Sequence, residues 1–198
     1  MSHAPRVVTR ALAAAPPRSW CRRQGGRASH RPLFAVGLAG GVLAAILGFG
    51  LHVNFSPSAP RGLYRTVTGA AVRGAWVVVC VSADAAALAR ARGYLRPGTC
   101  ASGVQPILKP VVAVAGDIVE LLPEAVIVNG QRLPVSRSAA VDGLGHPLPH
   151  AAWGRHVVGA DEVWIVSTRV PNSWDSRYLG PVPTAQIRSV ARPVWTVD

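Results

Sequence analysis

Residues 107–135 read ILKPVVAVAGDIVELLPEAVIVNGQRLPV. Valine, isoleucine and leucine dominate this stretch, and two turn signals interrupt it, Ala115-Gly116 and Asn129-Gly130. An Asn-Gly pair between apolar runs is the strongest short signal for a β-hairpin, because both residues accept the positive φ angles of a tight turn. The stretch therefore predicts strands at 107–114, 117–122, 126–128 and 132–135.

The β pattern continues on both sides of this stretch. β-Branched and aromatic runs predict further strands at 63–67, 76–81, 162–167 and 190–197. One interruption is helical: Ser82 is a good N-cap, and the predicted helix runs over 82–95. The segment 136–154 is polar and rich in Pro and Gly, which predicts a loop. We expect an all-β domain, a compact β-barrel or sandwich with one short helix.

The composition agrees with a single folded domain. The chain has 198 residues, of which 49% are hydrophobic and 15% charged, and this balance excludes a disordered chain. Gly (20) and Pro (17) are abundant, which favours a turn-rich β fold over a helix bundle.

An uncharged segment precedes the β domain. Residues 33–53 read LFAVGLAGGVLAAILGFGLHV. About 20 apolar residues span a bilayer core, so we expect a single transmembrane helix over 33–53. Residues 1–32 carry seven arginines and no acid. The positive-inside rule then makes residues 1–32 a basic, disordered cytoplasmic tail and residues 54–198 an exported domain.

Three other interpretations compete for this N-terminal region. A cleaved secretory signal should end in a small-residue site, whereas this run ends HVNF. A twin-arginine signal opened by Arg22 and Arg23 has no support from the surrounding residues. An organellar presequence remains open, because composition alone does not exclude it.

Two cysteines lie in the predicted exported part. Cys80 and Cys100 follow the span, whereas Cys21 precedes it. Disulfides persist in an oxidising compartment such as the bacterial periplasm. A bond between Cys80 and Cys100 would close a loop of about 20 residues and stabilise the fold by roughly 3 kcal/mol in the chain-entropy model. The alternative is a pair of buried, unbonded thiols.

The net charge of +12 is distributed unevenly along the chain. Residues 1–32 contribute +7, and residues 54–198 hold 14 basic residues and 9 acids, for +5. No basic stripe with interleaved aromatic residues is present, and an exported domain of +5 suits an anionic membrane surface. We therefore expect the lipid bilayer as a partner and no nucleic acid.

Two serines follow the span, in the segment NFSPSAPRGLY at 54–64. Its prolines and glycine restrict the backbone, so Ser56 and Ser58 are held at fixed positions. A serine needs a base to become a nucleophile. Spacing alone leaves open a triad with His146 or a histidine metal site, although Pro147 breaks the helical spacing between His146 and His150.

Lys109 is the better candidate base. It is the only lysine among 21 basic residues and lies in an apolar strand pattern. Burial disfavours the ammonium form, and a lysine whose pKa falls toward 7–8 becomes a usable general base. The non-catalytic alternative is a lysine at a strand edge whose amine reaches solvent.

Three boxes of sequence, in order, carry a family resemblance. The pattern N-x-[ST]-x-S-x-P-x-G-x-Y is met between Asn54 and Tyr64, L-K-x-V-x-x-x-x-G-D between Leu108 and Asp117, and S-x-D-S-R-Y-x-G between Ser173 and Gly180. With these boxes the chain resembles the type I signal peptidases, and most closely the TraF-type signal peptidases of conjugative transfer. The resemblance covers about three quarters of the chain.

The resemblance implies a serine endopeptidase with a Ser/Lys dyad on an all-β, signal-peptidase-like fold. Ser58 would be the nucleophile and Lys109 the general base. The Ser58 N–H and the Ser56 hydroxyl would form the oxyanion hole, and Ser173 would orient the lysine. Asp175 and Arg177 would support the third box. Neither a cofactor nor a metal is implied.

The expected function is cleavage of exported precursor proteins by an enzyme of the bacterial inner membrane whose catalytic domain is periplasmic. The expected substrates are pilin subunits of a conjugation apparatus, and in TraF-type relatives a substrate amine can resolve the acyl-enzyme to give a cyclic pilin. One alternative is a general type I signal peptidase with Ala-x-Ala specificity. Another is a catalytically silent, membrane-tethered assembly module.

Overall fold

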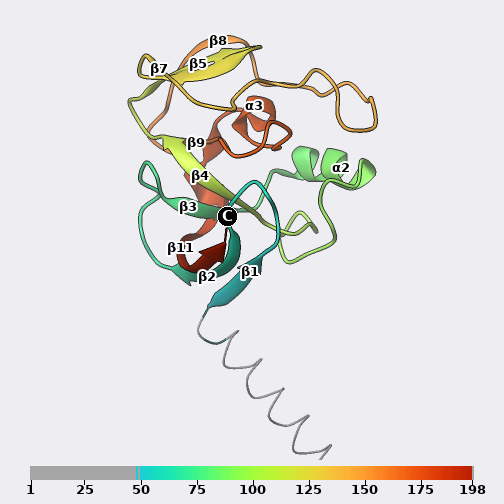
Figure 1. Cartoon of the computed structure of the whole chain (residues 1–198), viewed down its shortest axis with the longest axis vertical. Coiled ribbons are helices and arrows are strands. Elements are labelled where there is room, and N and C mark those ends of the chain that lie inside the picture. The colour runs from blue at the N-terminus through green and yellow to red at the C-terminus, as the bar shows by residue number, and fades with distance from the viewer. Residues whose placement is uncertain (1–47, 49, 198) are drawn as a thin grey trace, which may run out of the picture. The chain divides into compact units, whose positions relative to one another are not determined.

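The computed structural model describes residues 48 and 50–197 (Figure 1). Its strands form two antiparallel sheets, with the orders β1-β2-β11-β3-β4-β9-β10 and β7-β6-β5-β8. The larger sheet consists of β1 (Leu51–Asn54), β2 (Arg61–Val67), β11 (Ile187–Val197), β3 (Trp76–Val79), β4 (Ile107–Ala113), β9 (Glu162–Ile165) and β10 (Val182–Pro183). The smaller sheet consists of β7 (Gln131–Arg132), β6 (Ala125–Val128), β5 (Ile118–Leu122) and β8 (Gly154–Val157).

The central strands β4 and β9 connect two apolar cores. In Figure 1 they lie between the smaller sheet and the group of β1, β2 and β11. Val111 of β4 and Ile165 of β9 face each other and belong to the core that the larger sheet forms with helix α2 (Ala83–Ala91). Ala113 and Trp164, one step further along, belong to the core under the smaller sheet. A register shift between the two pairs lets the same strands serve both cores.

The hairpin expected at Asn129-Gly130 is present between β6 and β7. Asn129 (φ 49°) and Gly130 (φ 79°) both take positive φ angles, as a two-residue turn between strands of right-handed twist requires. The returning strand is only Gln131–Arg132, shorter than the predicted 132–135. The predicted strands at 107–114 and 117–122 correspond to β4 and β5, and most of the expected loop at 136–154 is irregular.

The expectation of one short helix is wrong. The first helix begins where predicted, with the Ser82 side chain accepting from Ala85 N, but it ends at Ala91. A second helix, α3 (Ser176–Leu179), has a single turn capped by the Asp175 side chain, and a 3₁₀ turn covers Thr184–Gln186. One turn of helix is too short to produce an amphipathic repeat, so the sequence pattern gave no sign of α3.

The predicted transmembrane helix over 33–53 is wrong at its C-terminal end. Residues 51–53 belong to β1, which pairs with β2 in a register that sets Val53 opposite Leu63. Gly50, just before β1, has φ +64°, and its carbonyl accepts from Thr66 N at 2.8 Å. Hydropathy alone cannot separate the end of an apolar helix from an apolar strand. The β domain, expected to begin at 54, therefore includes residues 51–53.

The rest of the predicted span, residues 33–47 and 49, and the tail 1–32 lie outside the described residues. Across residues 48 and 50–197, no helix has the length and apolar character needed to span a bilayer.

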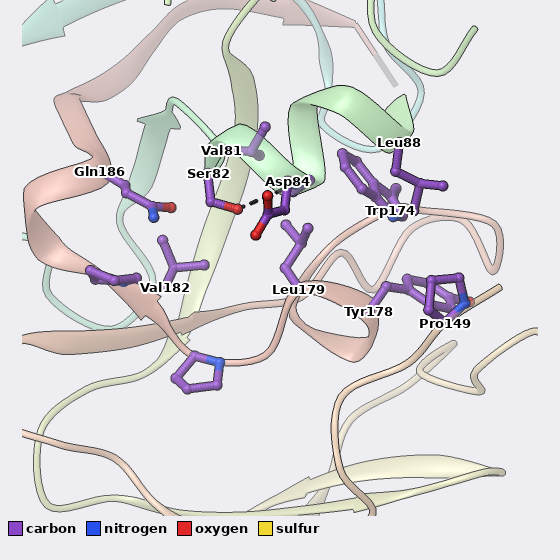
Figure 2. A pocket seen from close by; sticks show the side chains of 13 residues that line it. Val81, Ser82, Asp84, Leu88, Pro149, Trp174, Tyr178, Leu179, Val182 and Gln186 are labelled. Carbon is purple, nitrogen blue, oxygen red and sulfur yellow. Dashed lines mark hydrogen bonds between the residues drawn. The ribbon is translucent and has the colours of Figure 1, made fainter. Parts of the chain in front are cut away.

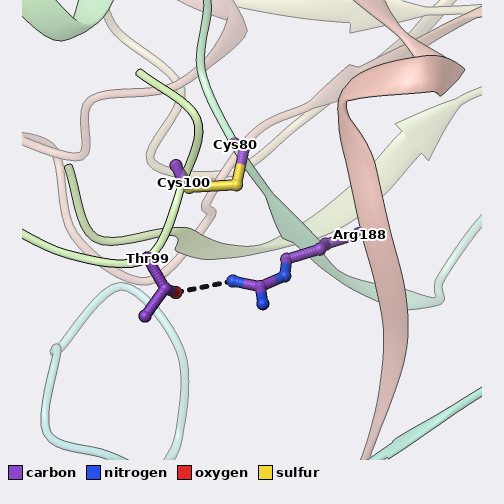
Figure 3. The surroundings of a disulfide bond; sticks show 4 residues. All are labelled: Cys80, Thr99, Cys100 and Arg188. Atoms are coloured by element: carbon purple, nitrogen blue, oxygen red, sulfur yellow. Dashed lines mark hydrogen bonds between the residues drawn. A yellow bond between two sulfur atoms is a disulfide. The ribbon is translucent and has the colours of Figure 1, made fainter. Parts of the chain in front are cut away.

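A disulfide joins Cys80 and Cys100 across 20 positions of sequence (Figure 3). It closes the chain around α2, and Arg188 of β11 donates to Thr99 Oγ1 at 2.6 Å beside it. The segment after α2 is thus attached to β3 covalently and to β11 by a hydrogen bond.

Gly62 permits the close approach of β2 and β11. Its φ is +142°, and a Cβ at this position would lie 2.2 Å from the Trp195 carbonyl oxygen. No side chain can occupy that space without moving the strand, so glycine is required here.

We predict that Gly62→Ala lowers the free energy of unfolding by roughly 2–4 kcal/mol, because it adds both a backbone clash and an unfavourable φ. Denaturant unfolding of the detergent-solubilised chain, followed by tryptophan fluorescence, measures the change. Gly143→Ala is the matched control, since a Cβ there meets nothing within 4 Å. Equal stability of the two variants would contradict the proposed packing of β2 on β11.

Candidate active site

The loop between β1 and β2 carries two serines on a rigid frame. The Asn54 side chain holds the loop from inside: its Nδ2 donates to the carbonyls of Ser56 (3.0 Å), Ala59 (3.2 Å) and Pro60 (3.0 Å), and its Oδ1 accepts from Ser56 N (3.1 Å). The Tyr64 hydroxyl donates to the same Pro60 carbonyl at 2.8 Å. These contacts explain why the first box combines an Asn, a Pro and a Tyr at fixed spacing.

Ser58 lies at the centre of this loop and is only 4% exposed. Its Oγ is 2.9 Å from Ser56 Oγ, and its backbone N–H donates to Ser56 Oγ at 3.4 Å. The Ser56 hydroxyl and the Ser58 N–H, both predicted as oxyanion donors, therefore lie next to each other and next to the Ser58 hydroxyl.

Lys109 reaches Ser58 from the core side of β4. Alternate residues of β4 are buried, and Lys109 shares the buried face with Ile107 and Val111. Its Nζ donates to Ser58 Oγ at 2.6 Å and to Ser173 Oγ at 2.9 Å. The non-catalytic alternative, a strand-edge lysine whose amine reaches solvent, is wrong, since Lys109 is only 6% exposed.

Burial changes the acidity of this amine. The pKa of Lys109 is lowered from 10.5 to about 8, chiefly because burial removes water from the ammonium; the Asp175 charge partly opposes this shift and the Arg177 charge adds to it. At pH 7 about one molecule in ten then carries a neutral amine, compared with about one in 3,000 for an unperturbed lysine. The site therefore holds a base that is available near neutral pH.

The third box forms a buried charge pair beside the lysine. Arg177, with 0% exposure, donates from Nε to Asp175 Oδ1 at 2.8 Å and from Nη2 to Asp175 Oδ2 at 2.9 Å. Its Nη2 also donates to the Ser173 carbonyl at 2.9 Å. Because both charges are paired and hydrogen-bonded, the segment that carries Ser173 is held in one position.

Ser167 lies two positions after the end of β9, and the sequence patterns did not identify it as a site residue. Its buried Oγ donates to the Ser58 carbonyl at 2.7 Å, and its backbone N–H donates to Asp175 Oδ2 at 3.0 Å. It therefore links the loop of Ser58 to the third box. No signal in the sequence marks it, because the two partners are 109 and 8 positions away.

Sequence matches to known proteins identify the family of this chain. Residues 30–196 match the family model described as signal peptidase, peptidase S26. The chain belongs to the S26 signal peptidase family. It is 37% identical to a "Plasmid transfer protein TraF" of Escherichia coli, over 80% of this chain and 88% of the relative.

Two further TraF relatives match the S26 chain at similar levels. A "Conjugal transfer protein TraF" of Agrobacterium tumefaciens is 40% identical over 77% of this chain and 86% of its own. A "Probable conjugal transfer protein TraF" of Sinorhizobium fredii is 39% identical over 79% of this chain and 82% of its own. Among solved structures, a signal peptidase I of Enterococcus faecalis aligns with 63% of this chain and 98% of its own, at 16% identity and a TM-score of 0.36.

The three histidines between 146 and 156 of this S26 chain have hydrogen-bond and ring partners other than Ser58. His146 Nδ1 is 3.0 Å from Asp142 Oδ2, and His150 stacks on Trp153. His156 Nε2 is 2.6 Å from the Ala152 carbonyl. The basic group within hydrogen-bond distance of the Ser58 hydroxyl is Lys109. The three imidazole rings have their hydrogen-bond partners elsewhere.

Two cavities differ in their relation to the serines. One, of about 400 Å³, lies between α2 and α3, with Ser82, Leu88, Trp174 and Leu179 around it (Figure 2). Ser58 and Lys109 do not line it. The other, of about 540 Å³, is lined by Pro57 and Ala59, the two neighbours of Ser58 in the chain.

We predict that the Lys109 amine titrates near pH 8 in the folded protein. Because the chain contains one lysine, protein labelled with ¹³Cε-lysine gives a single lysine resonance, and its chemical shift against pH reports the midpoint directly. The urea-unfolded chain is the control, and its lysine should titrate with the ordinary lysine pKa of about 10.5. A folded-state midpoint above 10 would contradict the burial argument.

The same shift has a consequence for stability. The folded pKa lies below the unfolded one, so the buried ammonium destabilises the fold below pH 8, and this cost disappears as pH rises from 8 to 10.5. Relative to Lys109→Met, the wild-type free energy of unfolding should gain about 3 kcal/mol over that interval.

We also predict that Ser167→Ala lowers the free energy of unfolding by about 1–3 kcal/mol, because it leaves the buried Ser58 carbonyl without its donor. Ser138→Ala is the matched control: its buried Oγ has no hydrogen-bond partner among the described residues, so its loss should change little. Denaturant unfolding compares the two. A Ser167→Ala protein as stable as Ser138→Ala would refute the link.

Proposed function

We propose that this S26 signal peptidase homologue is a membrane-anchored serine endopeptidase that matures exported precursor proteins in conjugative transfer. Ser58 is the nucleophile and Lys109 the general base. The observation that carries the proposal is the 2.6 Å contact between Ser58 Oγ and a buried Lys109 Nζ whose pKa is lowered to about 8.

Acylation starts with the neutral amine of Lys109. Nζ accepts the proton of the Ser58 hydroxyl while Oγ attacks the scissile carbonyl. The resulting ammonium then donates its proton to the leaving amine, and the C–N bond breaks. Ser173 Oγ, 2.9 Å from Nζ, holds the amine toward Ser58 throughout these transfers.

The negative charge that develops on the carbonyl oxygen needs donors. The Ser58 N–H and the Ser56 hydroxyl lie beside Ser58 Oγ and are suited to that role. In this structure the N–H points to Ser56 Oγ at 3.4 Å, a long and weak contact that a substrate oxygen can replace. Water or a substrate amine then resolves the acyl-enzyme.

The TraF names of the relatives favour conjugative transfer over general secretion as the setting. On that basis the proposed substrates are exported precursors of the transfer apparatus, with pilin subunits as the first to test. The apolar run at 33–50, which directly precedes β1, supports attachment to the inner membrane with a periplasmic catalytic domain, because the scissile bond of an exported precursor lies just outside the bilayer.

A general signal peptidase with Ala-x-Ala specificity is the enzyme alternative, and the choice of precursor tests it. A silent assembly module is the non-enzyme alternative. The depressed lysine pKa argues against it, since a buried amine costs stability that a purely structural role does not require.

We predict that Lys109→Arg is as inactive as Lys109→Ala in precursor cleavage. Arginine keeps the charge but stays protonated, so it cannot accept the Ser58 proton.

Ser58→Ala should also abolish cleavage, whereas Ser56→Ala should lower kcat by about 10²–10³, the usual cost of losing one oxyanion donor. Cleavage of a co-expressed pilin precursor of the cognate transfer system is measured by mass spectrometry, which also separates linear from cyclic product.

Folding is checked in the same samples by protease resistance, because a buried unpaired charge can cost about 3–5 kcal/mol by itself. A folded Lys109→Arg protein that still cleaves would remove lysine as the base. Cleavage of an Ala-x-Ala precursor but not of the pilin would favour the general signal peptidase. A wild-type chain that cleaves neither precursor would favour the silent module.

A further inference from the structure

Ser167 takes no part in the proposed proton transfers, but it contacts the backbone of the nucleophile. The residue is 0% exposed, and its Oγ donates to the Ser58 carbonyl at 2.7 Å. Ser58 carries both the attacking oxygen and one of the two oxyanion donors, its own N–H. The Ser167 hydroxyl therefore acts on the residue whose orientation the reaction needs most.

A hydrogen bond to the Ser58 carbonyl restricts the rotation of that residue. A residue has two soft backbone torsions, and one of them, ψ, relates the direction of the carbonyl to the directions of its N–Cα and Cα–Cβ bonds. A carbonyl that is held by a buried donor thus limits how far the N–H and the side chain of Ser58 can turn. Neither group needs to touch Ser167 to be held in this way.

Ser167 also closes a ring of contacts that includes the base. Lys109 Nζ donates to Ser58 Oγ at 2.6 Å and to Ser173 Oγ at 2.9 Å. From Ser173 the chain runs two positions to Asp175, whose Oδ2 accepts from the Ser167 N–H at 3.0 Å. The Ser167 hydroxyl completes the ring at Ser58. The nucleophile is thus connected to the segment of Ser173 through the lysine and, independently, through Ser167.

The two connections behave differently during the proposed reaction. The contact between Ser58 Oγ and Lys109 Nζ is consumed, because Oγ bonds to the scissile carbon and the ammonium turns to the leaving amine. The Ser58 carbonyl does not react, so its hydrogen bond from Ser167 can persist through these steps. A nucleophile has to stay within a fraction of an ångström of its productive position. The second connection meets that need when the first is lost.

We propose that Ser167 is a positioning residue: its hydroxyl holds the Ser58 backbone, so that the attacking oxygen and the oxyanion N–H keep their places while the contact with Lys109 is exchanged. The proposal rests on the proposed peptidase function and adds to it a residue that touches neither the substrate nor the transferred proton.

Cleavage kinetics of the full-length protein in detergent micelles test the proposal, with a purified pilin precursor as substrate. Ser167→Ala removes the hydroxyl, and Ser167→Cys keeps a side chain of similar size with a much weaker donor. Each change should lower kcat by about 10²-fold, the scale of a small misplacement of the reacting groups, and leave KM unchanged. Rates are expressed per folded molecule, counted by protease resistance, so that a loss of stability alone does not lower them.

Ser136→Ala is the matched control. Ser136 is also buried, and its Oγ donates to the Leu133 carbonyl at 2.6 Å and accepts from Val126 N at 3.0 Å. The change therefore removes a comparable buried hydroxyl beside the smaller sheet, and kcat per folded molecule should stay at the wild-type value. A Ser167→Ala protein whose kcat falls no further than that of Ser136→Ala would overturn the positioning role. A rise in KM without a fall in kcat would do the same.

An NMR measurement separates this proposal from the peptidase proposal. Protein that combines carbonyl-¹³C serine with ¹⁵N-alanine gives coupled signals only from Ser-Ala pairs, which occur at 58–59, 82–83 and 138–139. A second sample carries ¹³Cε-lysine, which reports Lys109 alone. In Ser167→Ala and Ser167→Cys, the signals of the 58–59 pair and of Lys109 should both move, whereas the other two pairs stay in place.

That result supports the positioning role even if the wild-type chain cleaves no precursor, in which case only the peptidase proposal fails. A Lys109 signal that stays in place in both variants shows that Ser58 keeps its contact with the amine without Ser167. The positioning role is then overturned, whatever the cleavage assay shows.

Discussion

The buried amine of Lys109 is the constraint on which the rest of the site depends. Its charged form is disfavoured by the apolar face of β4, so its pKa falls to about 8. An amine in that position also has to be hydrogen-bonded, and two hydroxyls, those of Ser58 and Ser173, meet that need. The packing that lowers the pKa of the lysine thus also directs its amine toward the serine.

A separate set of hydrogen bonds holds the segment that carries each hydroxyl. Ser58 lies on a loop fixed by the Asn54 side chain and by the Ser167 hydroxyl. Ser173 precedes the one-turn helix α3, whose buried Asp175–Arg177 pair anchors the segment. Ser167 connects the Ser58 loop to the segment of Ser173, since it contacts both the Ser58 carbonyl and the Asp175 carboxylate. The three boxes of sequence therefore describe one hydrogen-bonded unit.

The two-sheet arrangement serves this unit. β4 contributes Val111 to one core and Ala113 to the other, and the register shift between these two residues lets the strand pass from one core to the other. The smaller sheet, with its Asn129-Gly130 hairpin, covers the second core and lies on the other side of β4 and β9 from β1, β2 and β11 (Figure 1). The disulfide at Cys80 keeps the α2 region attached to the first core (Figure 3).

Much of this could be predicted from the sequence because the signals are local. Alternation marks the buried face of β4, Asn-Gly specifies its own turn, and Ser82 caps a helix through a contact three residues away. Lys109 stood out as the only lysine in an apolar strand. Family resemblance then assigned roles to Ser58 and Ser173, although neither residue is near Lys109 in the chain.

Other features were decided by the tertiary structure alone. Residues 51–53 are apolar enough for a membrane helix, but main-chain pairing with β2 makes them a strand. Helix α3 depends on a cap and a buried ion pair rather than on a periodic pattern. Ser167 acts across 109 positions of sequence, and the cavity of about 540 Å³ next to the Ser58 loop is lined by residues from three separate segments. Local physics specified the turns, the strand faces and the unusual lysine, whereas contacts between distant segments, which no local pattern encodes, determined which groups meet them.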